Sequence, residues 1–205
     1  MTIGARIDEC IAKLLVVDAE NAFIQLAIAI DGTAKRQYPS QRTTDRCKRF
    51  LRENLPFVLW SLTNGTPARG SEFTFEFSGS GVPNRSTKFE DLVYSVMRCA
   101  LLHEGEMPSK VEFVTASYIG MLGGRMQFPV ALIGALLFAV VASPVNVREK
   151  VADSSAFFFG ETRVPVAEIL GSLQKTKAAI RLGFLYDVEA LLAKLESDHA
   201  SSAEA

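Results

Sequence analysis

The sequence predicts a mostly α-helical bundle with a small β-hairpin, built as one domain. Of the 205 residues, 48% are hydrophobic, which is enough for one sizeable core and argues against extended disorder. Apolar residues recur with helical spacing in several segments, whereas strand-like alternation is confined to short stretches. Residues 1–196 are therefore expected to form a single helical domain, and residues 197–205 a flexible polar tail.

The N-terminal part is expected to hold two helices and a long loop. No proline or glycine interrupts residues 5–31, so one long helix is expected over about residues 3–36, ending at Asp31-Gly32 or just before Tyr38-Pro39. Thr43-Thr44-Asp45 is expected to cap a second helix over residues 46–55, and Pro56 either ends it or starts a short extension. Residues 63–86 are rich in glycine and proline, which indicates a long loop with one short strand at 73–77.

The clearest helix is predicted over residues 88–104. Thr87 and Glu90 have the spacing of a capping box, apolar residues follow at helical intervals, and Gly105 stands where a C-terminal cap belongs. The glycines within residues 111–128 predict a small hairpin insertion. Residues 130–142 are an uncharged apolar run, shorter than the roughly 20 residues that cross a bilayer, and predict a core helix. An irregular stretch at 144–165, with Phe157-Phe158-Phe159 as core packing, and helices near 166–173 and 185–195 complete the prediction.

Composition excludes several classes of function. The net charge is −1, from 23 acidic and 22 basic residues, so no global attraction to nucleic acid or lipid is expected. Cys10, Cys47 and Cys99 have neither a disulfide framework nor a zinc spacing and indicate buried thiols in a reducing compartment. Without a secretory signal or a spanning segment, a cytoplasmic location and no membrane partner are expected. No dinucleotide or phosphate-loop motif and no metal-ligand spacing occurs, so neither a cofactor nor a metal is expected.

The residues suited to chemistry are Arg98 and His103. The sequence contains two histidines, and because His199 lies in the tail, histidine-dependent chemistry falls on His103. Arginine is a fixed cation suited to phosphate, and imidazole transfers protons near neutral pH. Together they suffice for metal-free cleavage of RNA through attack of its 2′-hydroxyl on the adjacent phosphate. We therefore treat Arg98 and His103 as candidate catalytic residues.

The segment around this pair, Tyr94-Ser-Val-Met-Arg98-Cys-Ala-Leu-Leu-His103-Glu-Gly105-Glu, resembles bacterial members of the HEPN superfamily. The resemblance implies a helical homodimer with paired motifs facing each other across a cleft. In such proteins the arginine and histidine of the motif often belong to a metal-independent endoribonuclease. Arg98 matches the arginine and His103 the histidine, whereas Cys99 stands where active members carry a polar residue. The resulting expectation is binding of RNA or a nucleotide, extending to RNA cleavage. The alternative is a catalytically inactive module for protein interaction or regulation.

Purely structural roles are open for both residues. His103 could bind the free carbonyls at the end of its own helix, and Arg98 could pair with Asp91 or Glu104. On an ideal helix, five residues at about 100° each separate the two side chains by about 140°. Convergence on one phosphate therefore requires an unwound last turn or a second protomer.

A second candidate site is a basic stretch. Residues 35–52 contain seven basic residues and one acid, a local charge of +6 within a chain of net charge −1. Phosphate contacts favour such clustering, which predicts nucleic-acid binding through Arg36, Arg42, Arg46 and Arg49. The alternative is a solvated helix face.

Polar residues within the first predicted helix form a third feature. They are Asp18, Asn21, Gln25 and Asp31. Buried polar groups need partners, so an internal polar network, with Arg98 as one available cation, is expected rather than a second catalytic set. A further alternative for the whole protein is a small-molecule pocket roofed by residues 63–86.

Overall fold

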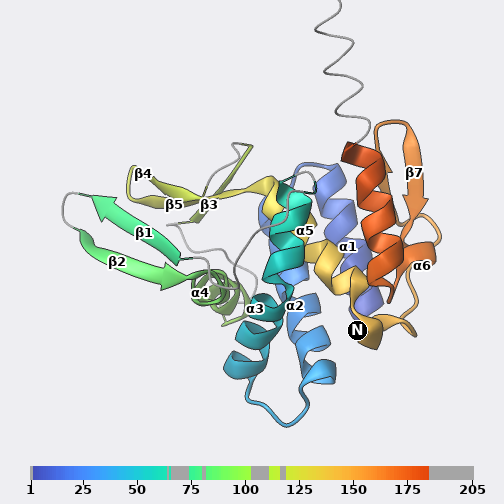
Figure 1. Cartoon of the computed structure of the whole chain (residues 1–205), viewed down its shortest axis with the longest axis horizontal. Helices are drawn as coiled ribbons and strands as arrows, with labels where there is room; N and C mark the ends of the chain where they lie inside the picture. Colours follow the sequence, from blue (N-terminus) through green and yellow to red (C-terminus); the bar gives the residue numbers. More distant parts are fainter. Residues whose placement is uncertain are drawn as a thin grey trace, which may run out of the picture.

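Three helices form the centre of the protein, which we describe from a computed structural model (Figure 1). They are α2 (Ala19–Gln37), α3 (Thr43–Leu62) and α5 (Val130–Ala142). The structure describes residues 2–63, 65, 74–79, 82–102, 111–115 and 119–184, with the backbone alone for 74–79, 82–86 and 98–102.

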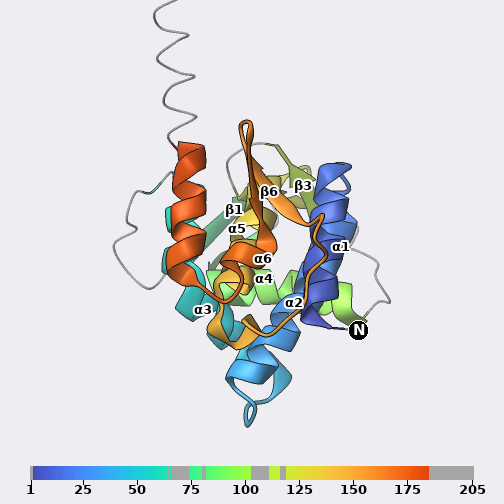
Figure 2. The same ribbon diagram turned by 90° about the vertical axis from the view of Figure 1, so that its right-hand side faces the viewer.

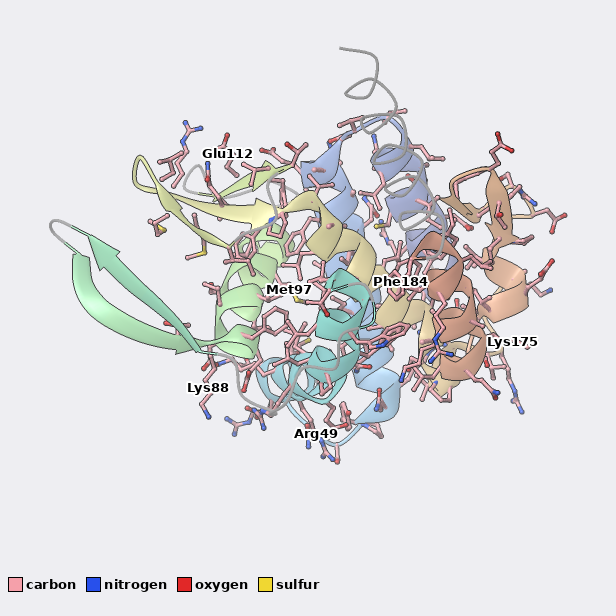
Figure 3. All side chains as sticks on the ribbon, turned by 45° about the horizontal axis from the view of Figure 1, so that its top comes forward. Arg49, Lys88, Met97, Glu112, Lys175 and Phe184 are labelled. Atoms are coloured by element: carbon pink, nitrogen blue, oxygen red, sulfur yellow. The ribbon has the colours of Figure 1, made fainter. Side chains whose placement is uncertain are left out.

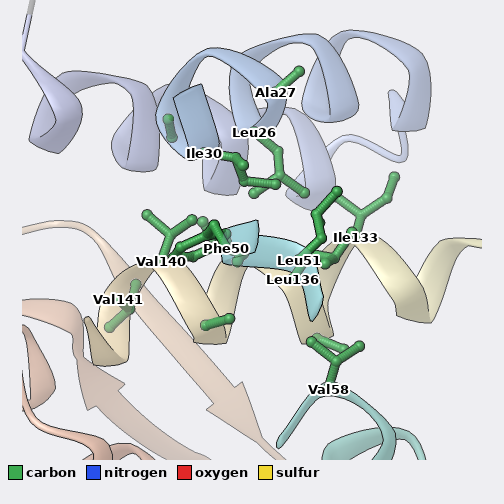
Figure 4. Close-up of a cluster of buried hydrophobic side chains, with 14 of the residues drawn as sticks. Leu26, Ala27, Ile30, Phe50, Leu51, Val58, Ile133, Leu136, Val140 and Val141 are labelled. Carbon is green, nitrogen blue, oxygen red and sulfur yellow. The ribbon is translucent and has the colours of Figure 1, made fainter. Parts of the chain in front are cut away.

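The core lies where these three helices meet. Figure 4 shows Leu26 and Ile30 of α2 facing Phe50 of α3 and both Leu136 and Val140 of α5. All five side chains are fully buried. α5 is apolar almost all round and is covered on most of its sides, which confirms the core helix predicted over residues 130–142.

Two further helices cover this core. α1 (Ile3–Leu15) packs along α2, and α4 (Phe89–Leu102) packs against α2 and α3. Met97 of α4 points into the interior, while Arg49, Lys88 and Lys175 lie at the periphery (Figure 3). After α5 come the short helices η1 (Pro144–Asn146) and α6 (Val166–Ile169) and a helix over residues 173–184.

The strands form three small sheets. β1 (Thr74–Gly79) and β2 (Val82–Lys88) make an antiparallel hairpin that projects from one side of the helices, and β6 (Ala156–Phe159) and β7 (Thr162–Pro165) make another on the opposite side (Figure 1). β3 (Val111–Val114), β4 (Gly120–Leu122) and β5 (Arg125–Pro129) form a mixed sheet in the order β3-β5-β4. The mostly helical class is therefore confirmed, with more β-structure than one hairpin.

The expected single helix over residues 3–36 is wrong, because the chain breaks between Leu15 and Ala19. Val17 adopts a left-handed backbone with φ of 60°, and the carboxylate of Asp18 caps the next helix by accepting from the N–H of Asn21 at 3.3 Å. After the break, α2 continues past Gly32 to Gln37.

The second helix is longer than predicted at both ends. It begins at Thr43, after Arg42 in the capping position without a side-chain cap bond, so the predicted cap at residues 43–45 is wrong. It also runs through Pro56 to Leu62. Burial of Phe57 and Val58 in the core offsets the loss of one backbone hydrogen bond at the proline.

The connecting regions also differ from the prediction. Residues 63–86 contain β1, which lies close to the strand predicted at 73–77, but they also contain most of β2, which was not predicted. Residues 111–128 are more than a hairpin, since β3 pairs with β5 in parallel and only β4 and β5 form the hairpin. The stretch 144–165 contains β6 and β7, and a helix at 173–184 was not predicted. The predicted helix at 185–195 and the tail at 197–205 lie outside the described residues.

The three consecutive phenylalanines of β6 divide between two environments. Phe157 and Phe159 pack on Phe138 of α5, with ring centroids 4.6 and 6.2 Å from it. Phe158 between them is exposed, since neighbouring side chains of a strand point to opposite faces. The predicted core role therefore holds for two of the three rings.

Candidate functional site

Of the predicted catalytic pair, Arg98 belongs to α4 and His103 follows the last residue of α4 in the sequence. The backbone of α4 is described as far as Leu102, whereas the side chain of Arg98 and all of His103 lie outside the described part of the chain. Asp91, one partner considered for Arg98, is paired with Lys48 at 2.7 Å. A catalytic role of Arg98 and His103 therefore stays a prediction.

Most cations of the basic stretch are paired with carboxylates. The pairs, with their N–O distances, are Arg36–Glu149 at 2.5 Å, Arg46–Asp31 at 2.7 Å, Lys48–Asp91 at 2.7 Å, Arg49–Glu53 at 2.7 Å and Arg52–Glu90 at 2.8 Å. Within the part of the chain that the structure describes, Lys35 and Arg42 are the two basic residues of this stretch without an acidic partner. Of the four arginines predicted to contact nucleic acid, three are thus engaged in ion pairs within the fold, and the contact itself stays a prediction.

One of these pairs belongs to a compact polar cluster. The guanidinium of Arg49 lies 4.4 Å from the ring centre of Tyr38, whose hydroxyl donates to Glu53 at 2.5 Å. Burial, together with the neighbouring Glu53 carboxylate, raises the pKa of Tyr38 to about 12. Burial acts to raise the pKa of Glu53 as well, but the hydrogen bonds from Tyr38 and Arg49 outweigh it and lower that pKa. The cluster joins the end of α2 to α3.

The polar residues of the N-terminal segment form separate contacts rather than one internal network. Asp18 binds Asn21 within the same turn, and Gln25 accepts from Arg6 of α1 at 2.5 Å. Asp31 accepts from Arg46 and also from the thiol of Cys47 at 3.4 Å. These polar residues thus have partners within the fold, as predicted, but in three local groups, and the side chain of Arg98 lies outside the described residues.

Two of the three cysteines behave as expected. Cys10 and Cys47 are free and completely buried. Burial raises the pKa of each thiol to about 12, so both are neutral near pH 7. The side chain of Cys99 lies outside the described residues.

The most unusual surface is the turn between α1 and α2, which we call the elbow and define as Leu15, Val16 and Val17. These consecutive aliphatic side chains are 64%, 70% and 82% exposed. The N–H of Val17 donates to Leu14 at 3.1 Å and that of Asp18 to Lys13 at 2.9 Å, a helix-ending pattern that normally places glycine at the left-handed position. Val17 occupies that position here, at a cost of about 1–2 kcal/mol for a side chain with a Cβ atom.

Beside the elbow lies a concave site, which we call the α1 groove. It encloses about 280 Å³ and is lined by Asp8, Glu9, Ile11, Ala12 and Leu15 from α1 and by Ala152, Ser154 and Ser155 from the segment before β6. Figure 2 shows α1 alongside β6 and this segment. The carboxylate of Asp8 fixes the two walls by accepting from the N–H of Ala152, at 3.1 and 3.0 Å to its two oxygens, and from the hydroxyl of Ser155.

The lining of the groove is partly apolar and partly polar. The groove combines aliphatic side chains with two carboxylates and two hydroxyls. Its volume is just below the roughly 300–1,000 Å³ of small-molecule sites. Among the described residues, no cluster of histidine, cysteine and acidic side chains could hold a metal ion. Neither the elbow nor the groove was predicted, although Asp18 followed by Asn21 after three aliphatic residues is a signal for a new helix start.

Fold and site together define a small, mostly helical protein with an apolar elbow and an adjacent acidic groove. The model of the Rv1289 protein family matches residues 2–190, and the chain belongs to this family. Two similar relatives are the proteins named uncharacterized protein Rv1289 of Mycobacterium tuberculosis and uncharacterized protein Mb1320 of Mycobacterium bovis. Each is 25% identical over 135 residues, which cover 62% of this chain and 63% of the relative. The alignment thus spans less than two thirds of these relatives, and no solved structure matches the chain.

The family match corrects the resemblance to HEPN proteins. It covers the segment from Tyr94 to Gly105 and assigns the chain to the Rv1289 family instead. An arginine five residues before a histidine on an amphipathic helix is too common a pattern to identify a superfamily. The match brings no support for RNA binding or nuclease activity, and in the described part of the chain no helix reaches the length and apolarity that crossing a membrane requires.

Proposed function

We propose that this protein is a non-catalytic interaction module that docks onto a partner protein through the α1–α2 elbow. The observation that carries the proposal is the state of Val17, which is 82% exposed and held at φ of 60°. A β-branched residue in this conformation is a true outlier, and glycine would relieve it. Such strain clusters at binding and catalytic sites.

The elbow offers enough apolar surface for an anchor. Fully burying an aliphatic side chain contributes about 1.5–3 kcal/mol, and Leu15, Val16 and Val17 stand together with most of their surface free. Interfaces owe most of their affinity to a few such central residues. Apolar side chains gathered at a rigid, hydrogen-bonded turn also lose little conformational entropy on binding.

Selection of random short linear peptides, displayed on phage, against the immobilised protein tests the proposal. We expect enriched peptides whose affinity falls about tenfold or more in Val17→Thr, a loss near 1.4 kcal/mol. Threonine keeps the shape and the backbone strain of valine but removes its apolar character. Val147→Thr is the matched control, because Val147 is also exposed, at 61%, and its neighbour Asn146 contacts Thr33 near the other end of α2.

Comparison of the two variants also shows which results would contradict the proposal. Enriched peptides that bind Val17→Thr and wild type equally would place the binding surface elsewhere and refute the elbow as the docking site. The same conclusion follows if no peptide is enriched. Circular dichroism of both variants verifies that a lost interaction does not reflect a lost fold.

A further inference from the structure

Resting on the proposed docking role of the elbow, we infer that the α1 groove receives a lysine or arginine side chain of the partner's docking segment. The elbow then holds the aliphatic residues of that same segment. The inferred ligand is thus a protein segment in which a basic residue stands next to aliphatic ones.

The first support is continuity. Leu15 belongs both to the elbow and to the lining of the groove. Asp8, Ala12 and Leu15 follow one another along α1 at helical spacing, so they lie on one strip of the helix surface. A segment lying on this strip contacts the elbow and the groove together.

The second support is charge. Glu9 is exposed and forms no ion pair with a described residue. Asp8 receives its described hydrogen bonds from a backbone N–H and a hydroxyl, so its negative charge is not neutralised by a described cation. Two basic residues of the elements beside the groove have partners of their own: Lys13 of α1 pairs with Asp18, and Arg163 of β7 donates to the carbonyl of Asp153. The groove therefore complements a positive charge.

The third support is the combination of size and lining. A volume of about 280 Å³ admits one long side chain with its neighbours. Lysine and arginine carry an aliphatic stem and a charged head, which matches a lining that combines the aliphatic Ile11 and Ala12 with the carboxylate of Glu9. An acidic segment would place like charges together, and a fully apolar one would leave the carboxylate of Glu9 without a partner of opposite charge.

The test uses the peptides that bind wild type more tightly than Val17→Thr, which we call elbow-dependent, and derivatives of them. In each peptide, every lysine or arginine is replaced in turn by norleucine, which keeps the aliphatic stem and removes the charge. At one position we expect wild-type protein to bind the basic form about fivefold more tightly, and this preference to fall with added salt. We expect Glu9→Gln to reduce the preference, while Glu168→Gln, an exposed acid on α6 outside the groove lining, leaves it unchanged.

The outcomes separate the two proposals. Peptides that need Val17 but show no preference for a basic residue, or keep it in Glu9→Gln, overturn the groove inference and leave the elbow in place. Absence of elbow-dependent peptides overturns both. Sedimentation equilibrium tests whether the surface is occupied by a second copy of this chain instead. A dimer that Val17→Thr dissociates would assign the surface to self-association, as in the predicted homodimer, and overturn the inferred partner segment.

Discussion

Gly4 donates its backbone N–H to Oε2 of Glu149 at 2.7 Å, and this contact joins the start of α1 to the segment that follows η1. The other oxygen of the carboxylate, Oε1, is bound by Arg36 of α2 at 2.5 Å. Glu149 thus satisfies a free N–H at a helix N-terminus, where a negative charge is favourable, and holds a cation at the same time. The position of α1, and with it one wall of the groove, depends on this carboxylate.

Replacing Gly4 with alanine is expected to destabilise the protein. A Cβ atom at Gly4 would lie 2.0 Å from the carbonyl oxygen of Lys150, so backbone must move, at a cost of about 1–3 kcal/mol. The matched control is Gly134→Ala in α5, where a Cβ atom meets nothing within 4 Å. This control should stabilise by about 0.5–1 kcal/mol, because alanine is the better helix former. Urea unfolding measures both changes, and equal effects would contradict the close approach at Gly4.

Removing the charge of Glu149 is expected to produce a pH-dependent loss of stability. Burial acts to raise the pKa of Glu149, but hydrogen bonds from Gly4 and Arg36 outweigh it and lower the pKa below 4.5. Because the folded pKa is depressed, the stabilisation is complete above about pH 4.5, the unfolded value, and is lost as the pH falls through the folded pKa. Glu149→Gln should therefore be less stable than wild type by about 1–3 kcal/mol at neutral pH.

The pH dependence of this stability difference tests whether the charge of Glu149 is responsible for it. The difference between wild type and Glu149→Gln should shrink in urea titrations below pH 4.5, and a constant difference would show that the charge is not responsible. Glu161→Gln, an exposed residue of the turn between β6 and β7, serves as the charge-matched control and should change stability by less than about 0.5 kcal/mol.

Two arginines of the basic stretch are expected to contribute differently to the stability of the protein. Arg46→Gln removes two hydrogen bonds to Asp31, at 3.1 and 2.7 Å, and should cost about 1–3 kcal/mol of stability. Arg42→Gln alters an exposed side chain without a partner among the described residues and should change stability by less than about 0.5 kcal/mol. Chemical unfolding gives both values. An unaffected Arg46→Gln would show that the ion pair contributes little to stability.

The sequence predicted the elements whose own residues determine them. Residues 130–142 are apolar on every side, and the start of α4 follows a regular helical spacing, so both were found close to their observed bounds. The break at the elbow was missed because Val16 and Val17 continue the apolar pattern of a helix. The course of α3 through Pro56 was left open because the burial of Phe57 is a tertiary effect that local preference does not contain.

The site was beyond sequence reasoning for a different reason. The groove depends on Asp8 meeting Ala152, which lies 144 residues further along the chain. The basic stretch was visible as a run of charges, but four of the five acids that pair with it come from α2, α4 and the segment after η1. A charge cluster in the sequence therefore predicted a free positive surface where the fold supplies counter-charges.

Val17→Gly offers a final prediction in which stability and binding change in opposite directions. Glycine adopts φ of 60° without the steric conflict of a Cβ atom, so the variant should gain about 1 kcal/mol in the free energy of unfolding. Its exposed side chain contributes nothing to the core that would be lost. The same variant should lose the elbow-dependent peptides, because the apolar anchor is gone. Urea unfolding and peptide titration on one preparation measure both effects. A destabilised Val17→Gly would show that the valine supports the fold, and strain would then no longer argue for a docking role.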